Sequence, residues 1–92
     1  MAKFGCLCCG FLTLDEEPNG TYEICPVCFW EDDWQQADDP DYAGGANRMS
    51  LNEARKNFQR IGAKEERNLS MVRPPLASEY WLGSDGRHES RE

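Results

Sequence analysis

The sequence contains no long hydrophobic run. In its 92 residues no apolar stretch approaches the roughly 18 to 20 residues that a membrane-spanning helix needs. The first five residues, Met-Ala-Lys-Phe-Gly, also lack the apolar stretch of a secretory signal. We therefore expect a protein that has no membrane partner and stays in the cytoplasm, where it is made.

The sequence also has few side chains in arrangements that could support catalysis. The only histidine, His88, lies in the last stretch of the chain, and no serine or cysteine nucleophile has a plausible general base beside it. The sequence thus contains no recognisable catalytic constellation. We predict that the protein is not an enzyme.

The sequence contains few basic residues: 17 acidic residues against 10 basic ones give a formal net charge of −7. The imbalance is confined to residues 1–41, which carry ten acids against Lys3 alone, while residues 42–92 carry nine bases against seven acids. Such a charge argues against a nucleic-acid partner, which needs a basic patch. Only six residues could supply one: Arg48, Arg55, Lys56, Arg60, Lys64 and Arg67.

A chain of this length makes one domain, and a small domain buries a smaller share of its surface than a larger one. The mean hydropathy of −0.77 indicates a polar surface around a small interior, so a bound metal would supply missing stability. The five cysteines are an odd number, which does not suit a disulfide framework. In a reducing compartment, thiolate ligation is the better use for them.

Four of the cysteines form two pairs of matched spacing, with two residues inside each pair and fifteen between the pairs. Two intervening residues make a tight turn, here called a knuckle, whose amides point at the sulfurs. Two knuckles can bring four thiolates to the tetrahedral shell, about 2.3 Å in radius, that Zn²⁺ prefers. A closed shell leaves no position for a substrate, so the predicted ion is structural. The predicted ligands are Cys6, Cys9, Cys25 and Cys28.

Other uses of the cysteines stay open. Iron is bound by similar knuckles in rubredoxin, although nothing else in this chain indicates electron transfer. The four cysteines could also be buried or redox-active without metal, which their matched spacing disfavours. The fifth, Cys8, is expected to point away from the metal as a packed thiol. A redox sensor is the alternative, and the negative charge of a four-thiolate zinc centre argues against it because it disfavours a second anion nearby.

The predicted fold class is small α+β, built on a zinc-ribbon hairpin. Two short β-prone runs, residues 11–14 and 21–24, are joined by a turn containing Pro18-Asn19-Gly20. This arrangement predicts a β-hairpin in which each strand meets a cysteine pair at the same end.

A long acidic loop is predicted over residues 31–47, which are rich in Asp, Gly and Gln and show no periodicity. A loop of this length is either functional or held in place, here by Trp34 and Tyr42. Its carboxylates do not follow the EF-hand pattern, and we expect them to form a solvated acidic face. The aromatic residues Phe29, Trp30 and Trp34 are expected to sheath the metal site, whereas an exposed tryptophan would indicate a partner surface.

A helix is predicted to begin at Ser50, whose hydroxyl and the Glu53 carboxylate can form a capping box. Gly62 is the expected stop. The spacing of the apolar residues inside this span gives one stripe, formed by Leu51, Ala54, Phe58 and Ile61.

Residues 63–72 are expected to add one or two further helical turns before Arg73-Pro74-Pro75 ends them. Residues 76–82, with Tyr80 and Trp81, have enough apolar surface to dock back on the body. We predict one domain over residues 1–82, and a frayed tail over residues 83–92, which contain no apolar side chain to anchor them.

Several of these motifs together resemble the bacterial cysteine-rich CPCC family. They are Cys6-x-Cys8-Cys9-Gly10, the run from Tyr22 to Asp32 around Cys25-Pro26-Val27-Cys28, Ser50-Leu51-x-Glu53-Ala54-Arg55-x-Asn57-Phe58, and Val72-Arg73-x-Pro75. The resemblance implies a compact metal-binding domain that includes the helix and Arg73, and it implies no particular activity. The chain has Leu7 where the family's name implies proline, which should loosen the first knuckle without removing a ligand.

Three functions are compatible with this reading. The first is a zinc-supported, non-enzymatic protein-interaction module, possible in a sharper form as an acidic inhibitor or immunity-type protein that blocks a basic enzyme. The second is a thiol-redox or metal-sensing protein that uses Cys8. A nucleic-acid-binding zinc ribbon is third, disfavoured by the charge.

Overall fold

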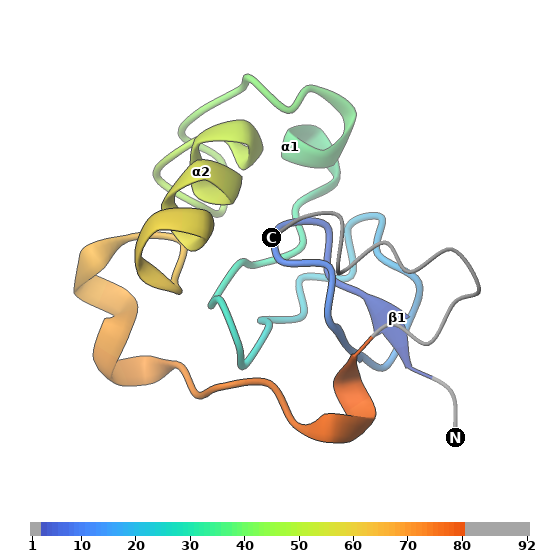
Figure 1. Cartoon of the computed structure of the whole chain (residues 1–92). Helices are drawn as coiled ribbons and strands as arrows, with labels where there is room; N and C mark the ends of the chain where they lie inside the picture. The colour runs from blue at the N-terminus through green and yellow to red at the C-terminus, as the bar shows by residue number, and fades with distance from the viewer. Residues whose placement is uncertain (1–2, 81–92) are drawn as a thin grey trace.

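The computed structural model describes residues 3–80 (Figure 1). Along the chain it contains two short strands, two α-helices and two 3₁₀ helices. The helices α1 and α2 lie together on one side of the molecule and β1 lies on the other, while the segment from η1 onward crosses back beneath them toward the strands (Figure 1). The elements are β1 (Phe4–Gly5), β2 (Leu12–Leu14), α1 (Trp34–Asp38), α2 (Leu51–Ile61), η1 (Glu66–Met71) and η2 (Ala77–Glu79).

The small α+β class is confirmed, but the predicted strand pairing is wrong. Strand β2 pairs antiparallel with β1, on the other side of the first knuckle, and not with residues 21–24. Residues 21–24 instead run beside the chain that leaves the second knuckle, with an isolated antiparallel bridge between Ile24 and Glu31. Each knuckle is therefore closed by its own antiparallel pair, because the chain that enters it lies beside the chain that leaves it.

The acidic loop prediction is also corrected, since residues 31–47 contain helix α1. Asp33 caps this helix, accepting from the amides of Gln35 and Gln36. The loop is held by buried polar side chains: the Gln36 amide group donates to the carbonyls of Tyr42 and Met49 at 3.0 and 2.9 Å. The aromatic residues expected to hold it are exposed, Trp34 at 54% and Tyr42 at 38%.

Helix α2 begins and ends where predicted, although only the Ser50 half of the capping box forms. The Ser50 hydroxyl accepts from the Glu53 amide at 3.1 Å, and Gly62 ends the helix in the left-handed region at φ 89°. On the predicted stripe, Leu51 and Ala54 are fully buried, and Phe58 packs against the core.

The chain after α2 returns to the strands, as predicted for residues up to Tyr80. Residues 66–71 form the 3₁₀ helix η1, and the Arg73 amide then donates to the Pro26 carbonyl at 3.1 Å. Tyr80 packs edge-on against Phe11, with ring centroids 5.0 Å apart. Trp81, Leu82 and the predicted tail over residues 83–92 lie outside the described residues.

The core is built around the cysteines. All five are buried, and the apolar side chains packed with them come from both knuckles, the chain after α1 and helix α2: Leu14, Val27, Trp30, Met49, Leu51 and Ala54. A metal in this position would stabilise most of the interior. Among residues 3–80, no helix is long and apolar enough to cross a membrane.

Candidate metal centre

The structure gathers four of the five sulfurs into one buried cluster. The Sγ atoms of Cys6, Cys9, Cys25 and Cys28 all lie within 4.8 Å of one another. Two of the separations are 3.6 Å, between Cys6 and Cys28, and 3.7 Å, between Cys9 and Cys25. A tetrahedron with metal–sulfur bonds of about 2.3 Å has edges of about 3.8 Å. The donor set and its spacing therefore fit a tetrahedral thiolate-bound metal ion.

The first knuckle is held by its own backbone. The Gly10 amide donates to the Cys6 carbonyl at 2.8 Å, and the Cys6 amide donates to the Phe11 carbonyl at 2.9 Å. The Cys8 amide points at the Cys6 sulfur, 3.4 Å away. Gly10 sits at φ 84°, a left-handed conformation that glycine adopts without steric cost. The knuckle closes with Leu7 in the place of proline.

The second knuckle repeats this pattern. The Phe29 amide donates to the Cys25 carbonyl at 2.8 Å, and the Cys25 amide donates to the Trp30 carbonyl at 3.0 Å. The Val27 amide points at the Cys25 sulfur at 3.4 Å. Phe29, at φ 72°, occupies the left-handed position that Gly10 has in the first knuckle. A non-glycine residue there carries a conformational cost, which the packing around the cluster must outweigh.

Burial and the neighbouring sulfurs shift the pKa values of the clustered thiols. Burial raises the pKa of the Cys28 thiol. Hydrogen bonds from Cys28, Cys6 and Cys9 lower the pKa of Cys25, whose sulfur also lies 3.1 Å from the Thr13 hydroxyl. Four adjacent thiolates repel one another, so all four ionise together only when a cation is bound. Metal binding at this site therefore releases protons, and low pH opposes it.

Cys8 does not belong to the group of sulfurs that could hold one ion. Its side chain is nevertheless buried, with 6% of the residue exposed. It is also among the groups that raise the pKa of Cys28. The thiol is thus buried and outside the ligand group, in agreement with the predicted packed thiol.

Two acidic residues assigned to the solvated face are buried instead. Asp32 is 1% exposed, and one of its carboxylate oxygens accepts from three successive backbone amides, those of residues 19–21. Asp33 is 7% exposed and accepts from the Ala46 amide as well as capping α1. These roles were missed because a run of acidic residues reads as solvent-exposed. The signals that could have found them are the turn-forming Asn19-Gly20 and the capping position before Trp34.

Three of the exposed apolar side chains of the N-terminal half form a second feature. Tyr22, Ile24 and Trp34 are 53%, 47% and 54% exposed. They lie on neighbouring segments: the Tyr22 amide donates to the Asp32 carbonyl, and Gly20 touches Trp34 so closely that an added Cβ would lie 2.7 Å from the Trp34 Cβ. We call the aromatic residues Tyr22 and Trp34, together with the aliphatic Ile24, the aromatic surface. Of the three residues expected to sheath the metal, Trp30 is buried and Trp34 is not.

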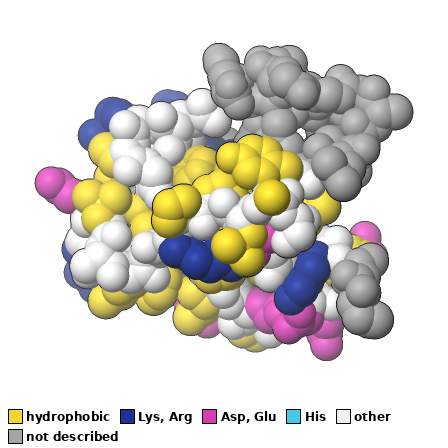
Figure 2. Space-filling view, turned by 60° about the horizontal axis from the view of Figure 1, so that its bottom comes forward, with side chains coloured by type: hydrophobic (Ala, Val, Ile, Leu, Met, Phe, Trp, Pro, Cys, Tyr) yellow, Lys and Arg dark blue, Asp and Glu magenta, His cyan; other side chains and the backbone are white. Residues whose placement is uncertain are grey.

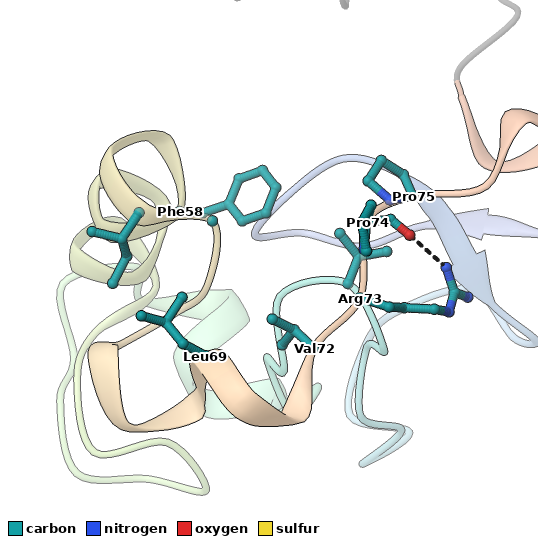
Figure 3. Close-up of a pocket in the computed structure, with 9 residues that line it drawn as sticks. Phe58, Leu69, Val72, Arg73, Pro74 and Pro75 are labelled. Carbon is teal, nitrogen blue, oxygen red and sulfur yellow. Dashed lines mark hydrogen bonds between the residues drawn. The ribbon is translucent and has the colours of Figure 1, made fainter.

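An apolar groove lies between helix α2 on one side and η1 with the segment that follows it on the other (Figure 3). Its volume is about 300 Å³, its walls include Phe58, Leu69 and Val72, and Val27 of the second knuckle also lines it. The Arg73 side chain points out of it toward the Pro74 carbonyl (Figure 3). Figure 2 shows the side of the molecule that lies at the bottom of Figure 1, where apolar side chains lie beside basic and acidic ones. Two apolar side chains of this part of the chain, those of Met71 and Leu76, are more than half exposed.

The fold and the cluster define a small α+β domain with a four-cysteine site positioned to hold a metal ion. The model of the family described as Cysteine-rich CPCC matches residues 4–79. The chain therefore belongs to the cysteine-rich CPCC family, as the motifs in its sequence indicated. A comparison with curated proteins finds no significant match.

Proposed function

We propose that this protein is a non-enzymatic protein-interaction module built on one structural Zn²⁺ ion, and that it acts as an acidic inhibitor or immunity-type protein toward a basic partner. The observation that carries the proposal is the exposure of Trp34, more than half of which faces solvent. A small domain with few apolar residues gains stability by burying a tryptophan. Leaving one outside is typical of a surface that a partner covers.

The charge around the aromatic surface indicates the kind of partner. Exposed carboxylates precede and follow its residues in the sequence, and no base precedes residue 48 except Lys3. The flanking acids are Glu16, Glu17, Asp38, Asp39 and Asp41. Acidic side chains in the same part of the chain as apolar anchors steer encounter with a cationic protein and disfavour acidic ones. The expected partner thus presents basic side chains around an apolar pocket.

Zinc is the ion that this site suits best. Four thiolates in a tetrahedral arrangement are typical of structural zinc, and a shell closed by four protein ligands leaves no position for a substrate. Native mass spectrometry with metal analysis of the protein as expressed tests this: we expect one zinc per chain. Two zinc ions per chain, iron, or an intact fold without metal would each overturn it.

The two alternative functions have less support. Burial of Cys8 limits access of oxidants and electrophiles to its thiol. The basic residues that a nucleic-acid interface would need are largely engaged: Arg48 and Arg67 both pair with Glu65, and Arg55 donates to the Leu7 carbonyl. Lys64 is buried. These contacts favour the protein-interaction proposal.

Affinity purification from the native host, with the full-length protein as bait, tests the interface. Wild type is compared with Trp34→Ser and with Leu69→Ser, a matched control in which an exposed apolar side chain is lost from the opposite half of the sequence. We expect wild type and Leu69→Ser to retain a basic protein at low salt, and Trp34→Ser to lose it. Raising the salt should weaken capture. A captured set that is unchanged by Trp34→Ser, or that consists of nucleic acid, would contradict the proposal.

A further inference from the structure

Lys64 is a buried lysine next to the metal centre. Only 8% of the residue is exposed. Its backbone amide donates to the Cys28 carbonyl at 2.8 Å, and its ammonium group lies 5.5 Å from the centroid of the Phe29 ring. Both contacts are with the second knuckle, so the position of Lys64 is tied to the cluster.

The ammonium group of Lys64 is held by a neutral acceptor. It donates to Asn47 Oδ1 at 2.9 Å. Asn47 is itself fully buried and fixed, because its side-chain amide donates to the Glu31 carbonyl and to Gln36 Oε1 at 2.8 and 2.9 Å. Lys64 therefore cannot move toward solvent without breaking a buried network.

The positive charge of Lys64 needs a negative counterpart. Buried charges in proteins are normally paired, yet within residues 3–80 no carboxylate lies within ion-pair distance of this ammonium group. Burial lowers the pKa of Lys64, whereas Glu65, Glu31 and Cys28 raise it through space. With a divalent ion bound, four thiolates leave the cluster with a net charge of −2, so the metal centre brings a net negative charge to the knuckle that Lys64 contacts.

We propose that Lys64 is the counter-cation of the metal centre and suppresses the nucleophilicity of its thiolates, so that the centre remains an unreactive scaffold. This inference rests on the zinc ion proposed above. A metal-bound thiolate attacks an electrophile by donating its electron pair to carbon. With iodoacetamide, the new S–C bond forms as the C–I bond breaks, iodide leaves with its electron pair, and the alkylated sulfur becomes a weak ligand that releases zinc.

The size of the effect follows from the chemistry of thiolates. A nearby cation lowers the basicity of a thiolate by about one to three powers of ten. Nucleophilicity follows basicity with an exponent of about 0.4 to 0.5. Removing the charge of Lys64 should therefore accelerate alkylation of the cluster by roughly three- to thirtyfold.

The experiment measures zinc release from the full-length protein during reaction with iodoacetamide, followed with a colorimetric zinc chelator. Lys64→Gln keeps an N–H donor for Asn47 but removes the positive charge, whereas Lys64→Arg keeps the charge. As a control, Lys56→Gln removes a positive charge from the exposed face of α2. We expect faster release only in Lys64→Gln. Metal content of the wild type is measured first, so a failure of the zinc proposal appears separately, as a wild type without zinc.

Each outcome decides the question. Loss of zinc from Lys64→Gln during expression, with retention in Lys64→Arg, would also support a role for the charge. Equal release rates for wild type and Lys64→Gln would overturn the inference. A Lys64→Arg variant that reacts or loses zinc in the same way as Lys64→Gln would also overturn the inference. The effect would then depend on the shape of the lysine side chain and not on its charge.

Discussion

The carboxylate of Asp32 accepts both the amide and the hydroxyl proton of Thr21, at 2.8 and 2.9 Å. The same oxygen also accepts the amides of Asn19 and Gly20. Four donors thus converge on one buried oxygen that lies just beyond the second knuckle. Through this contact the turn after β2 is attached to the chain that leaves the metal cluster, although the two segments do not form the predicted hairpin.

Replacing Asp32 by Asn should destabilise the domain by about 2 to 3 kcal/mol, because hydrogen bonds to a charged acceptor are strong and an amide cannot accept four donors equally well. Urea unfolding of the metal-loaded protein measures the change. Asp38→Asn, which alters an exposed carboxylate, serves as the control and should cost less than about 0.5 kcal/mol. Equal stabilities for the two variants would show that the convergent hydrogen bonds contribute little.

The five single Cys→Ser variants should separate into two groups. Loss of Cys6, Cys9, Cys25 or Cys28 removes a thiolate from a closed shell whose binding free energy, about 10 to 16 kcal/mol in small zinc peptides, is also folding free energy. These four variants should lose most of their metal and fold poorly, while Cys8→Ser keeps both. Zinc per chain and the thermal midpoint are measured for all five. A Cys8→Ser variant that loses zinc while Cys9→Ser retains it would reverse the ligand assignment.

Ser50→Ala should cost about 1 kcal/mol, the usual effect of removing an N-cap acceptor, because the Ser50 hydroxyl receives the Glu53 amide at the start of α2. Chemical unfolding measures this, and Ser70→Ala, at an exposed position, is the control. Zinc content should not change. Loss of metal from Ser50→Ala would mean that the helix and the knuckles unfold as one cooperative unit.

The ion pair of Arg73 with Glu79 should give the return segment a pH dependence. The hydrogen bonds from the Arg73 guanidinium hold the pKa of Glu79 below its usual range. A carboxylate whose pKa is depressed in the folded state stabilises the fold above its unfolded pKa, and this contribution is lost as the pH falls through the folded value. A carbon-detected NMR titration should show Glu79 titrating below the ordinary glutamate range in wild type and moving up toward it in Arg73→Gln. A titration unchanged by Arg73→Gln would contradict the assignment.

The features that the sequence predicted correctly are those encoded within a few residues. The spacing inside each cysteine pair produces a knuckle, because an intervening amide points at the first sulfur and the amide after the pair donates to the carbonyl of the first cysteine. The Ser50 cap, the apolar stripe and Gly62 likewise define α2 by contacts within one or two helical turns. In the knuckles and in α2, the hydrogen-bond donors and acceptors that define the structure lie within a few residues of one another in the chain.

The features that the sequence predicted wrongly depend on distant partners. Residues 11–14 and 21–24 are both suited to strands, and a turn connects them, so local preference allows the hairpin. Each segment pairs instead with chain on the other side of its own knuckle. Helix α1 was missed because its buried residue is Gln36, whose partners lie around residues 42–49, and such a helix has no apolar periodicity to reveal it.

By itself the sequence determined which cysteines could form a metal site, where the main helix begins and ends, and the family to which the chain belongs. Only the tertiary structure decided which polar and aromatic residues are inside. Asp32, Asp33 and Lys64 are buried because donors or rings from separate segments converge on them, whereas Trp34 is left outside. Burial of a charged side chain requires that its partners arrive together, and this convergence is a property of the folded chain that residue type and spacing do not reveal.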